Sequence, residues 1–156
     1  MMSKTTRREL TEFESYVIDK KGTEKPFTGE YCNTVSEGHY HCKKCDNALY
    51  RSQDKFPSHC GWPSFDDEIH GAVRRIADAD GQRTEIVCAA CEAHLGHVFK
   101  GEGFTAKNLR HCVNSISLVF KPADAQQKAV ALFASGCFWG TEFHFAKAVG
   151  VLATKV

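Results

Sequence analysis

The sequence lacks the features by which membrane, secreted and nucleic-acid-binding proteins are usually recognised. No apolar run approaches the roughly 18 residues that a membrane-spanning helix needs, and the basic start has no apolar segment behind it, as a secretory signal would. The 20 Lys and Arg residues are balanced by 19 Asp and Glu residues, so the basic surplus of a nucleic-acid-binding protein is also absent. We therefore expect a cytoplasmic protein whose partners are neither nucleic acids nor membranes.

What is present is the composition of an ordinary globular domain, with 42% hydrophobic and 25% charged residues in a chain of 156. Leu10, Phe13 and Val17 recur at helical spacing and predict a short amphipathic helix. Residues 38–121 consist of short β-like segments, and DADGQR at 78–83 predicts a hairpin turn rather than a calcium loop, whose later ligands are missing. The sequence therefore predicts a mainly β domain of antiparallel strands with one short N-terminal helix.

The character of the chain changes after Pro122. Residues 122–128 form a polar linker, and residues 129–156 begin as a new buried strand that turns at Gly136 into a helix. A strand and one helix cannot enclose a core of their own. We therefore expect residues 1–121 to form the main domain and residues 129–156 to be the incomplete start of a second one.

Four of the eight cysteines lie in two Cys-x-x-Cys hooks, CKKC and CAAC. An even cysteine count also suits a disulfide framework, but the length of the chain, its apolar content and a reducing cytoplasm argue against one. Two hooks supply the tetrahedral sulfur set that a structural zinc prefers, whereas a thioredoxin-like dithiol needs a βαβ context that neither hook has. The sequence predicts one structural Zn²⁺ with these four ligands: Cys42, Cys45, Cys88 and Cys91.

RHCVNSISLVF, residues 110–120, predicts one continuous strand that unusually begins with polar groups and a thiol. One face of this strand runs from polar to apolar through Cys112, Asn114, Ile116, Leu118 and Phe120. Two interpretations of Cys112 follow. It is either a small buried hydrophobe, the common fate of a free cysteine, or a nucleophile at the mouth of a cleft.

The neighbours of Cys112 favour the nucleophile. Arg110 and His111 precede it, and positive charge stabilises the thiolate, which is the attacking form. His94 and His97 are three residues apart and face one site if the backbone coils there. An imidazolium at that site can donate a proton to a leaving oxygen.

HCGWPSF, residues 59–65, contains a second thiol outside the hooks. Gly61 and Pro63 predict a bend that exposes Cys60 and Trp62 on a loop. A second thiol on a loop suits disulfide exchange, and an exposed Trp can form one wall of a small apolar pocket. The alternative is a core Trp in a tight turn.

Three stretches, KFPSHCGWPSF, CAACEAHLGHVF and LRHCVNSISLVF, together with the two hooks, resemble the methionine-(R)-sulfoxide reductase family, MsrB, over about residues 8–121. The resemblance implies a zinc-bearing β domain of two antiparallel sheets. It implies that Cys112 attacks the sulfur of methionine sulfoxide, in peptides or proteins, and becomes a sulfenic acid as methionine leaves. It also implies that Cys60 resolves this acid as a Cys60–Cys112 disulfide, which thioredoxin reduces.

The same resemblance assigns roles to the residues around the two thiols. Trp62 matches the aromatic residue that packs on the S-methyl group of the substrate. His94, His97 and Asn114 match groups that hold the sulfoxide oxygen or an ordered water, with His97 as the expected proton donor. Arg110 matches a basic residue beside the nucleophile.

ASGCFWGTE, in the C-terminal segment, resembles the start of MsrA, the reductase for the other sulfoxide epimer, with Cys137 at the nucleophile position. The chain thus resembles an MsrB–MsrA fusion cut short, and we expect no activity on the S-epimer. Cys32 is either a passive thiol or a spare resolving thiol. Two other classes stay open: a zinc-ribbon interaction module without turnover, and a thiol-disulfide oxidoreductase that acts through the hooks.

Overall fold

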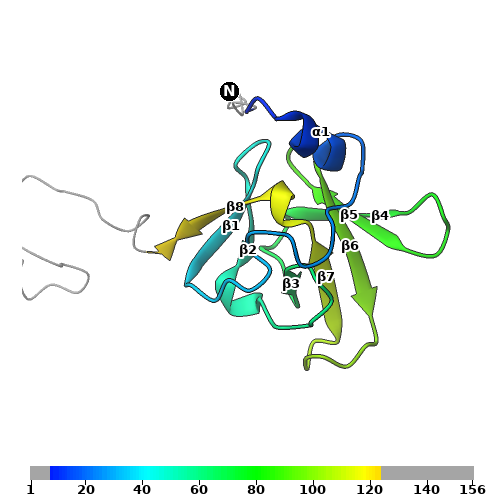
Figure 1. Cartoon of the computed structure of the whole chain (residues 1–156). Coiled ribbons are helices and arrows are strands. Elements are labelled where there is room, and N and C mark those ends of the chain that lie inside the picture. The colour runs from blue at the N-terminus through cyan, green and yellow to red at the C-terminus, as the bar shows by residue number, and fades with distance from the viewer. Residues whose placement is uncertain (1–7, 124–156) are drawn as a thin grey trace, which may run out of the picture.

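The computed structural model describes residues 8–123, which form two antiparallel sheets and one short helix (Figure 1). In chain order the elements are α1 (Glu12–Ile18), β1 (Gly38–Cys42), β2 (Ala48–Arg51), the 3-10 turn η1 (Ser52–Asp54), β3 (Ser64–Phe65), β4 (Val73–Ala77), β5 (Thr84–Cys88), β6 (His94–Lys100), β7 (Leu109–Val113), the 3-10 turn η2 (Ser115–Ser117) and β8 (Leu118–Pro122). The predicted mainly β class with two antiparallel sheets is confirmed.

The strands are ordered β2-β1-β8 in the three-stranded sheet and β3-β7-β6-β5-β4 in the five-stranded sheet. Aromatic rings join the two sheets: Phe65 of β3 stacks on Tyr50 of β2 at 4.3 Å between ring centroids and meets Tyr40 of β1 edge-on at 5.2 Å. All three side chains are fully buried. The core therefore lies where the sheets face each other, and burial of large rings supplies much of its apolar area.

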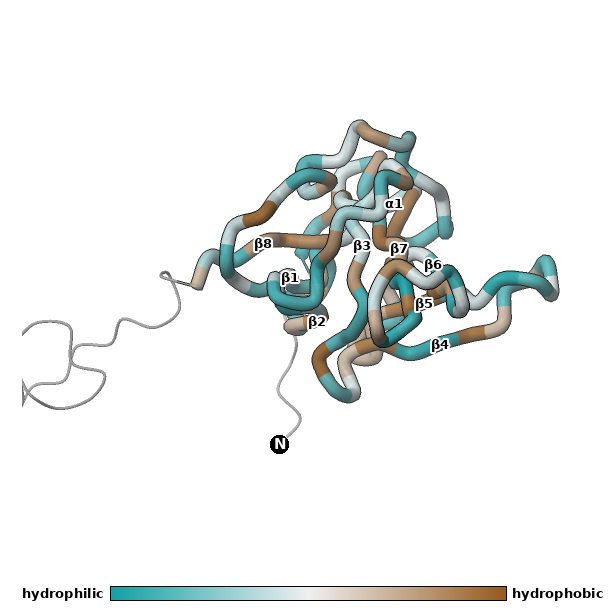
Figure 2. The backbone as a smooth tube through the Cα atoms, turned by 90° about the horizontal axis from the view of Figure 1, so that it is seen from below, coloured by the Kyte–Doolittle hydropathy of each residue, from teal (hydrophilic) through white to brown (hydrophobic). Residues whose placement is uncertain are grey.

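The β4–β5 hairpin forms as predicted, with the backbone N–H of Asp78 donating to the carbonyl of Arg83 at 2.9 Å. The hairpin projects from the body of the domain, and its tip is hydrophilic (Figures 1 and 2). Within residues 8–123, no helix is long and apolar enough to cross a membrane. The segment 129–156, with Cys137, lies outside the described residues.

The prediction of one continuous strand over residues 110–120 is wrong. β7 ends at Val113, a 3-10 turn follows, and β8 pairs with β1 in the other sheet. At the break, the side chain of Glu24 accepts a hydrogen bond from the backbone N–H of Ser115 at 2.9 Å, and Asn114 donates to the carbonyl of Leu95 at 3.0 Å. These side-chain bonds replace ladder bonds, so the alternation and the predicted common face end here.

The predicted helix is present but faces the core with different residues. Thr11 and Glu14 form a capping box that fixes its start, which places Leu10 before the helix. Val17 and Ile18 are buried, whereas the ring of Phe13 is 48% exposed. The assignment of Phe13 to the apolar face was therefore wrong.

Gly96 in β6 allows the close approach of β7. A Cβ at this position would lie 1.9 Å from the carbonyl oxygen of Cys112, which is a backbone atom that cannot swing away. We expect Gly96→Ala to lower the free energy of unfolding by more than about 2 kcal/mol, measured by urea denaturation. Gly71→Ala is the control, because open space surrounds that Cβ and only the cost of a positive φ, about 1 kcal/mol, applies. An unfolding midpoint of Gly96→Ala equal to that of Gly71→Ala would contradict the packing argument.

Candidate functional site

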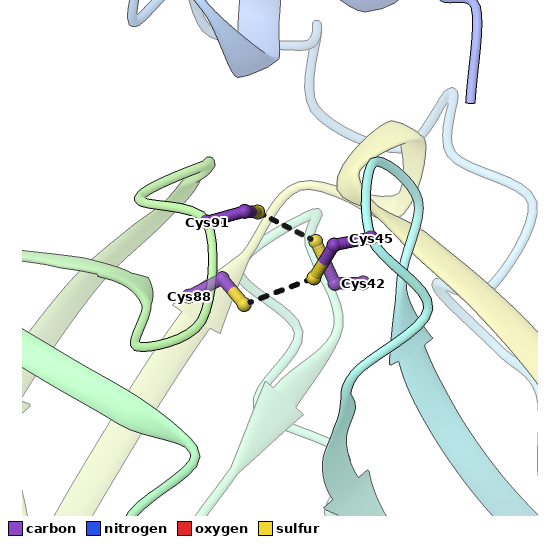
Figure 3. Close-up of side chains that lie close together, drawn as sticks. All are labelled: Cys42, Cys45, Cys88 and Cys91. Atoms are coloured by element: carbon purple, nitrogen blue, oxygen red, sulfur yellow. Dashed lines mark hydrogen bonds between the residues drawn. The ribbon is translucent and has the colours of Figure 1, made fainter. Parts of the chain in front are cut away.

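The two cysteine hooks have the same local geometry. In each, the residue after the second cysteine, Asp46 or Glu92, has a positive φ and donates its backbone N–H to the carbonyl of the first cysteine at 2.8 Å. The hooks follow β1 and β5, so one comes from each sheet. This tight turn directs both sulfurs of a hook to one side (Figure 3).

The four sulfurs of the hooks fit a zinc ion. All lie within 4.8 Å of one another, and the Cys42–Cys91 and Cys45–Cys88 pairs are each 3.6 Å apart (Figure 3). A tetrahedral zinc with Zn–S bonds near 2.3 Å requires S···S distances of roughly 3.8 Å. The donor set is all sulfur and mostly buried, which suits a closed structural site.

Cys60 and Cys112, the two thiols of the proposed chemistry, are brought near each other by the pairing of β3 with β7. Ser64 of β3 pairs with Cys112 of β7, and the bend before β3 brings Cys60 back over this pair. The sulfur of Cys60 accepts from the Ser58 hydroxyl at 3.0 Å and lies 3.5 Å from the Ser64 hydroxyl. The Cys112 thiol lies close enough for each of the two thiols to shift the pKa of the other. Two free thiols this near each other are candidates for a disulfide.

Each of the two thiols shifts the pKa of the other. Hydrogen bonds from Cys112 and from two serine hydroxyls lower the pKa of Cys60 to about 4, against the effect of burial. The hydrogen bond with Cys60, together with burial, raises the pKa of Cys112, and the Arg110 guanidinium acts in the opposite direction. Because the two thiols interact, their titration belongs to the pair and not to either sulfur alone. That Cys112 attacks as the thiolate stays a prediction.

The two histidines face one site because β6 contains an extra residue. Ile86 pairs with Gly96 and Val87 with His94, so the register slips by one residue at Leu95. The rings of His94 and His97 come within 5.8 Å between centroids. The hypothesis that they share a site is supported by this distance.

His97 is the better placed of the two to act on a substrate at Cys112. It is the direct cross-strand partner of Cys112, and its Nε2 lies 2.7 Å from Asp78 Oδ2. His94 is buried, and its Nδ1 lies 3.2 Å from Glu85 Oε2. Burial lowers the pKa of His94, which makes it a weak candidate for a protonated acid.

Trp62 is tied to the N-terminal segment. Its Nε1 donates to the carbonyl of Glu24 at 2.9 Å, and the backbone N–H of Phe27 donates to the carbonyl of Gly61 at 2.8 Å. Trp62, together with Phe27 and Phe56, lines a cavity of about 340 Å³ beside the Cys60 loop. The ring is half-buried. The predicted bend with Trp62 at a pocket wall is present in this arrangement.

The two residues that precede Cys112 lie on opposite faces of β7. Arg110 lies on the Cys112 face of β7, binds Glu102 at 2.8 Å and sits 4.5 Å over the Phe99 ring. His111 points to the opposite face, where it is fully buried with Nδ1 3.0 Å from the Tyr50 hydroxyl. The prediction that His111 adds charge next to the Cys112 sulfur is therefore wrong.

Asn114 is buried and its side chain bonds to backbone on both sides. Its Oδ1 accepts from the N–H of Glu24 at 2.9 Å, and its Nδ2 donates to the carbonyl of Leu95 at 3.0 Å. These contacts tie the N-terminal segment to β6. They favour a role for Asn114 in holding the site together, and its predicted contact with a substrate oxygen stays a prediction.

The family model described as "SelR domain" matches residues 10–122, which span the two hooks, the thiol pair and both histidines. The chain belongs to the SelR domain family. Among proteins similar to it, "Peptide methionine sulfoxide reductase B5" of Arabidopsis thaliana is 55% identical over 108 residues, covering 69% of this chain and 78% of that protein. "Peptide methionine sulfoxide reductase B2, chloroplastic" of the same plant is 57% identical over 107 residues, covering 68% of this chain and 53% of that protein.

A third relative, "Peptide methionine sulfoxide reductase B3, chloroplastic" of Oryza sativa subsp. japonica, is 56% identical over 113 residues. This match covers 72% of the present chain and 49% of the relative. The chain thus spans about half the length of the two chloroplastic relatives.

Within this SelR domain, several residues that support the site were not predicted from the sequence. Glu24 holds both the Trp62 ring and the end of β7, and Asp78 binds His97. Ser58 and Ser64 bond to the Cys60 sulfur. Only the serines had a local signal, because they flank the cysteine in the bend; the contacts of Glu24 and Asp78 depend on the tertiary fold.

Proposed function

We propose that this chain reduces the R-epimer of methionine sulfoxide in peptides or proteins to methionine. The observation that carries the proposal is the position of His97 directly across the strand from Cys112, with the free Cys60 thiol nearby. The printed names of the relatives, which are peptide methionine sulfoxide reductases at about 55% identity, support it. The Trp62 ring, at the wall of its cavity, would take the S-methyl side of the substrate.

In the first step, Cys112 attacks the sulfoxide sulfur. It attacks as the thiolate, the form that the Arg110 guanidinium beside it stabilises. A sulfoxide oxygen is a poor leaving group unless it gains a proton, and His97 supplies one. The thiolate, the sulfoxide and this proton together give methionine and the Cys112 sulfenic acid.

In the second step, Cys60 attacks the sulfenic sulfur of Cys112. A disulfide forms and water leaves, which protects Cys112 from irreversible oxidation. A thioredoxin dithiol then exchanges with the Cys60–Cys112 disulfide and returns both thiols to the reduced state.

The zinc that the hooks fit would be structural in this enzyme. One hook begins at the last residue of β1, Cys42, and the other at the last residue of β5, Cys88, so the ion would join the two sheets. With four thiolates it offers no open coordination position, and the reduction described above uses none.

The test of the proposal is reduction of a methionine sulfoxide peptide resolved by epimer, with zinc content measured on the same protein. We expect turnover of the R-epimer only, with about one zinc per chain. Turnover of neither epimer would contradict the proposal. Turnover of the S-epimer would contradict the expectation that the MsrA-like segment 129–156 is inactive.

Cys60→Ser should separate the two chemical steps. Cys112 can still attack, because the hydrogen bond that most raises its pKa is gone while Arg110 remains. We expect about one methionine per chain in a single-turnover assay and a stalled reaction with thioredoxin, whereas dithiothreitol supports continued turnover. Wild-type rates with thioredoxin would mean that another thiol, such as Cys32, is the resolving cysteine.

A further inference from the structure

The projecting β4–β5 hairpin reaches the candidate active site through one carboxylate. Asp78, the first residue after β4, places Oδ2 2.7 Å from Nε2 of His97, a contact that spans 19 positions in the sequence. The side chains are 22% and 16% exposed, so water only partly screens the pair. A half-buried carboxylate on the ring of the proposed acid is the arrangement that orients catalytic histidines in other enzymes.

The turn holds this carboxylate in place. Oδ1 of Asp78 accepts the backbone N–H of Ala79 at 2.7 Å, and its own N–H donates to the carbonyl of Arg83. Arg83 also lies 3.4 Å from Oδ2. The hydrogen bond from His97 lowers the pKa of Asp78, so the carboxyl group is ionised at neutral pH and can only accept.

An acceptor at Nε2 determines which nitrogen of the ring carries the proton. Because ionised Asp78 has no proton to donate, Nε2 of His97 must be the protonated nitrogen in the neutral ring. Nδ1 is then the nitrogen that gains and loses a proton. His97 stands opposite Cys112 on the neighbouring strand, where a bound sulfoxide would lie.

We propose that Asp78 is a positioning residue that fixes the tautomer and orientation of His97, so that Nδ1 donates the proton to the sulfoxide oxygen. This inference rests on the proposed function. Asp78 itself touches neither substrate nor Cys112 and acts only through the ring that it holds.

The other charged groups near His97 have different partners. The ring of His94 lies 5.8 Å away and bonds to Glu85, which in turn pairs with Lys21. Glu85 is the backbone cross-strand partner of His97, but its carboxylate is used by His94 and Lys21. Among the described residues, Asp78 is therefore the carboxylate in direct contact with the His97 ring.

Asp78→Asn tests this role with little change in shape. The amide oxygen can still accept from Ala79, while the amide nitrogen then faces Nε2 and donates to it, which reverses the tautomer and removes the negative charge. We expect kcat for an R-sulfoxide peptide to fall by about 10- to 100-fold, with KM within about 2-fold and an unchanged melting temperature. The kcat–pH profile should also change, because the variant removes the negative charge beside the ring.

Asp80→Asn is the matched control in the same turn. Asp80 pairs with Arg83 at 2.8 Å and accepts the N–H of Gln82, without contacting His97. We expect its pH profile to match the wild type. Asp78→Glu, which keeps the charge, should recover part of the activity lost in Asp78→Asn.

¹⁵N chemical shifts of the His97 ring give a readout that does not depend on turnover. We expect the neutral ring to be protonated at Nε2 in the wild type and at Nδ1 in Asp78→Asn. Identical shifts and pH profiles in the two proteins would overturn the inference, as would an equal loss of kcat in Asp80→Asn. If the wild type reduced no sulfoxide, the proposed function would be contradicted. A tautomer that still differed between the wild type and Asp78→Asn would nevertheless show that Asp78 fixes the tautomer of His97.

Discussion

Cys112→Ser should reduce no methionine sulfoxide, even with dithiothreitol in excess. A serine hydroxyl has neither an accessible pKa nor the nucleophilicity of a thiolate, and removal of the attacking group in enzymes costs on the order of 10⁴–10⁶ in rate. The fold should persist, because sulfur and oxygen differ little in size and Cys112 is half-buried rather than a core residue. The measurement is the initial rate with an R-sulfoxide peptide, together with the melting temperature.

Cys32→Ser is the control for this variant, because Cys32 is another half-buried thiol outside the hooks. It should retain a rate within about 2-fold of the wild type. A Cys112→Ser protein that keeps more than about 1% of the wild-type rate would exclude Cys112 as the nucleophile. Such a rate is a loss of at most about 100-fold, far smaller than the loss expected for removal of the attacking group. It would also revive the hook-dithiol alternative, which does not need Cys112.

Cys88→Ser should lose the zinc and melt at a much lower temperature. Cys88 is fully buried, and its sulfur lies 3.6 Å from the sulfur of Cys45. The two cysteines belong to different hooks, one at the end of β5 and the other at the end of β1 in the other sheet. Zinc affinities in small structural sites are about 10–16 kcal/mol, while whole domains are stable by only ~5–15 kcal/mol. Even a decrease of about 3 kcal/mol in the free energy of unfolding lowers Tm by roughly 12–24 °C in a domain of about 100 residues.

Zinc content and thermal unfolding, measured on Cys88→Ser and Cys112→Ser side by side, check this expectation. Cys112→Ser should keep its zinc and its Tm, so each variant is the control for the other. A Cys88→Ser protein that melts like the wild type would contradict a structural metal. Hooks that react freely with thiol reagents while the protein stays folded would favour redox-active dithiols instead.

Local patterns were sufficient to predict the hooks, the β4–β5 turn and the bend at Cys60. Each depends on residues a few positions apart, such as the spacing of Cys42 and Cys45, or Gly61 beside Cys60. For such motifs the chemistry of neighbouring residues largely determines the backbone.

The features that were missed depend on distant contacts. The strand break after Val113 requires Glu24, which bonds to Ser115 from 91 positions away. The shared site of His94 and His97 was a conditional prediction, but the register slip against β5 that creates it was not predicted, because no property of β6 alone specifies it. Asp78 could be predicted only as a turn residue, because its contact with His97 exists only once the hairpin has folded over β6.

The most direct test of the account is to map the cysteines after one oxidation cycle without reductant. Reduced wild-type protein is mixed with an excess of R-sulfoxide peptide, alkylated and digested, and the disulfide peptides are compared with the methionine formed. The account predicts one Cys60–Cys112 disulfide for each methionine. Methionine formed while Cys112 remains alkylatable, or a disulfide between other cysteines in its place, would contradict it.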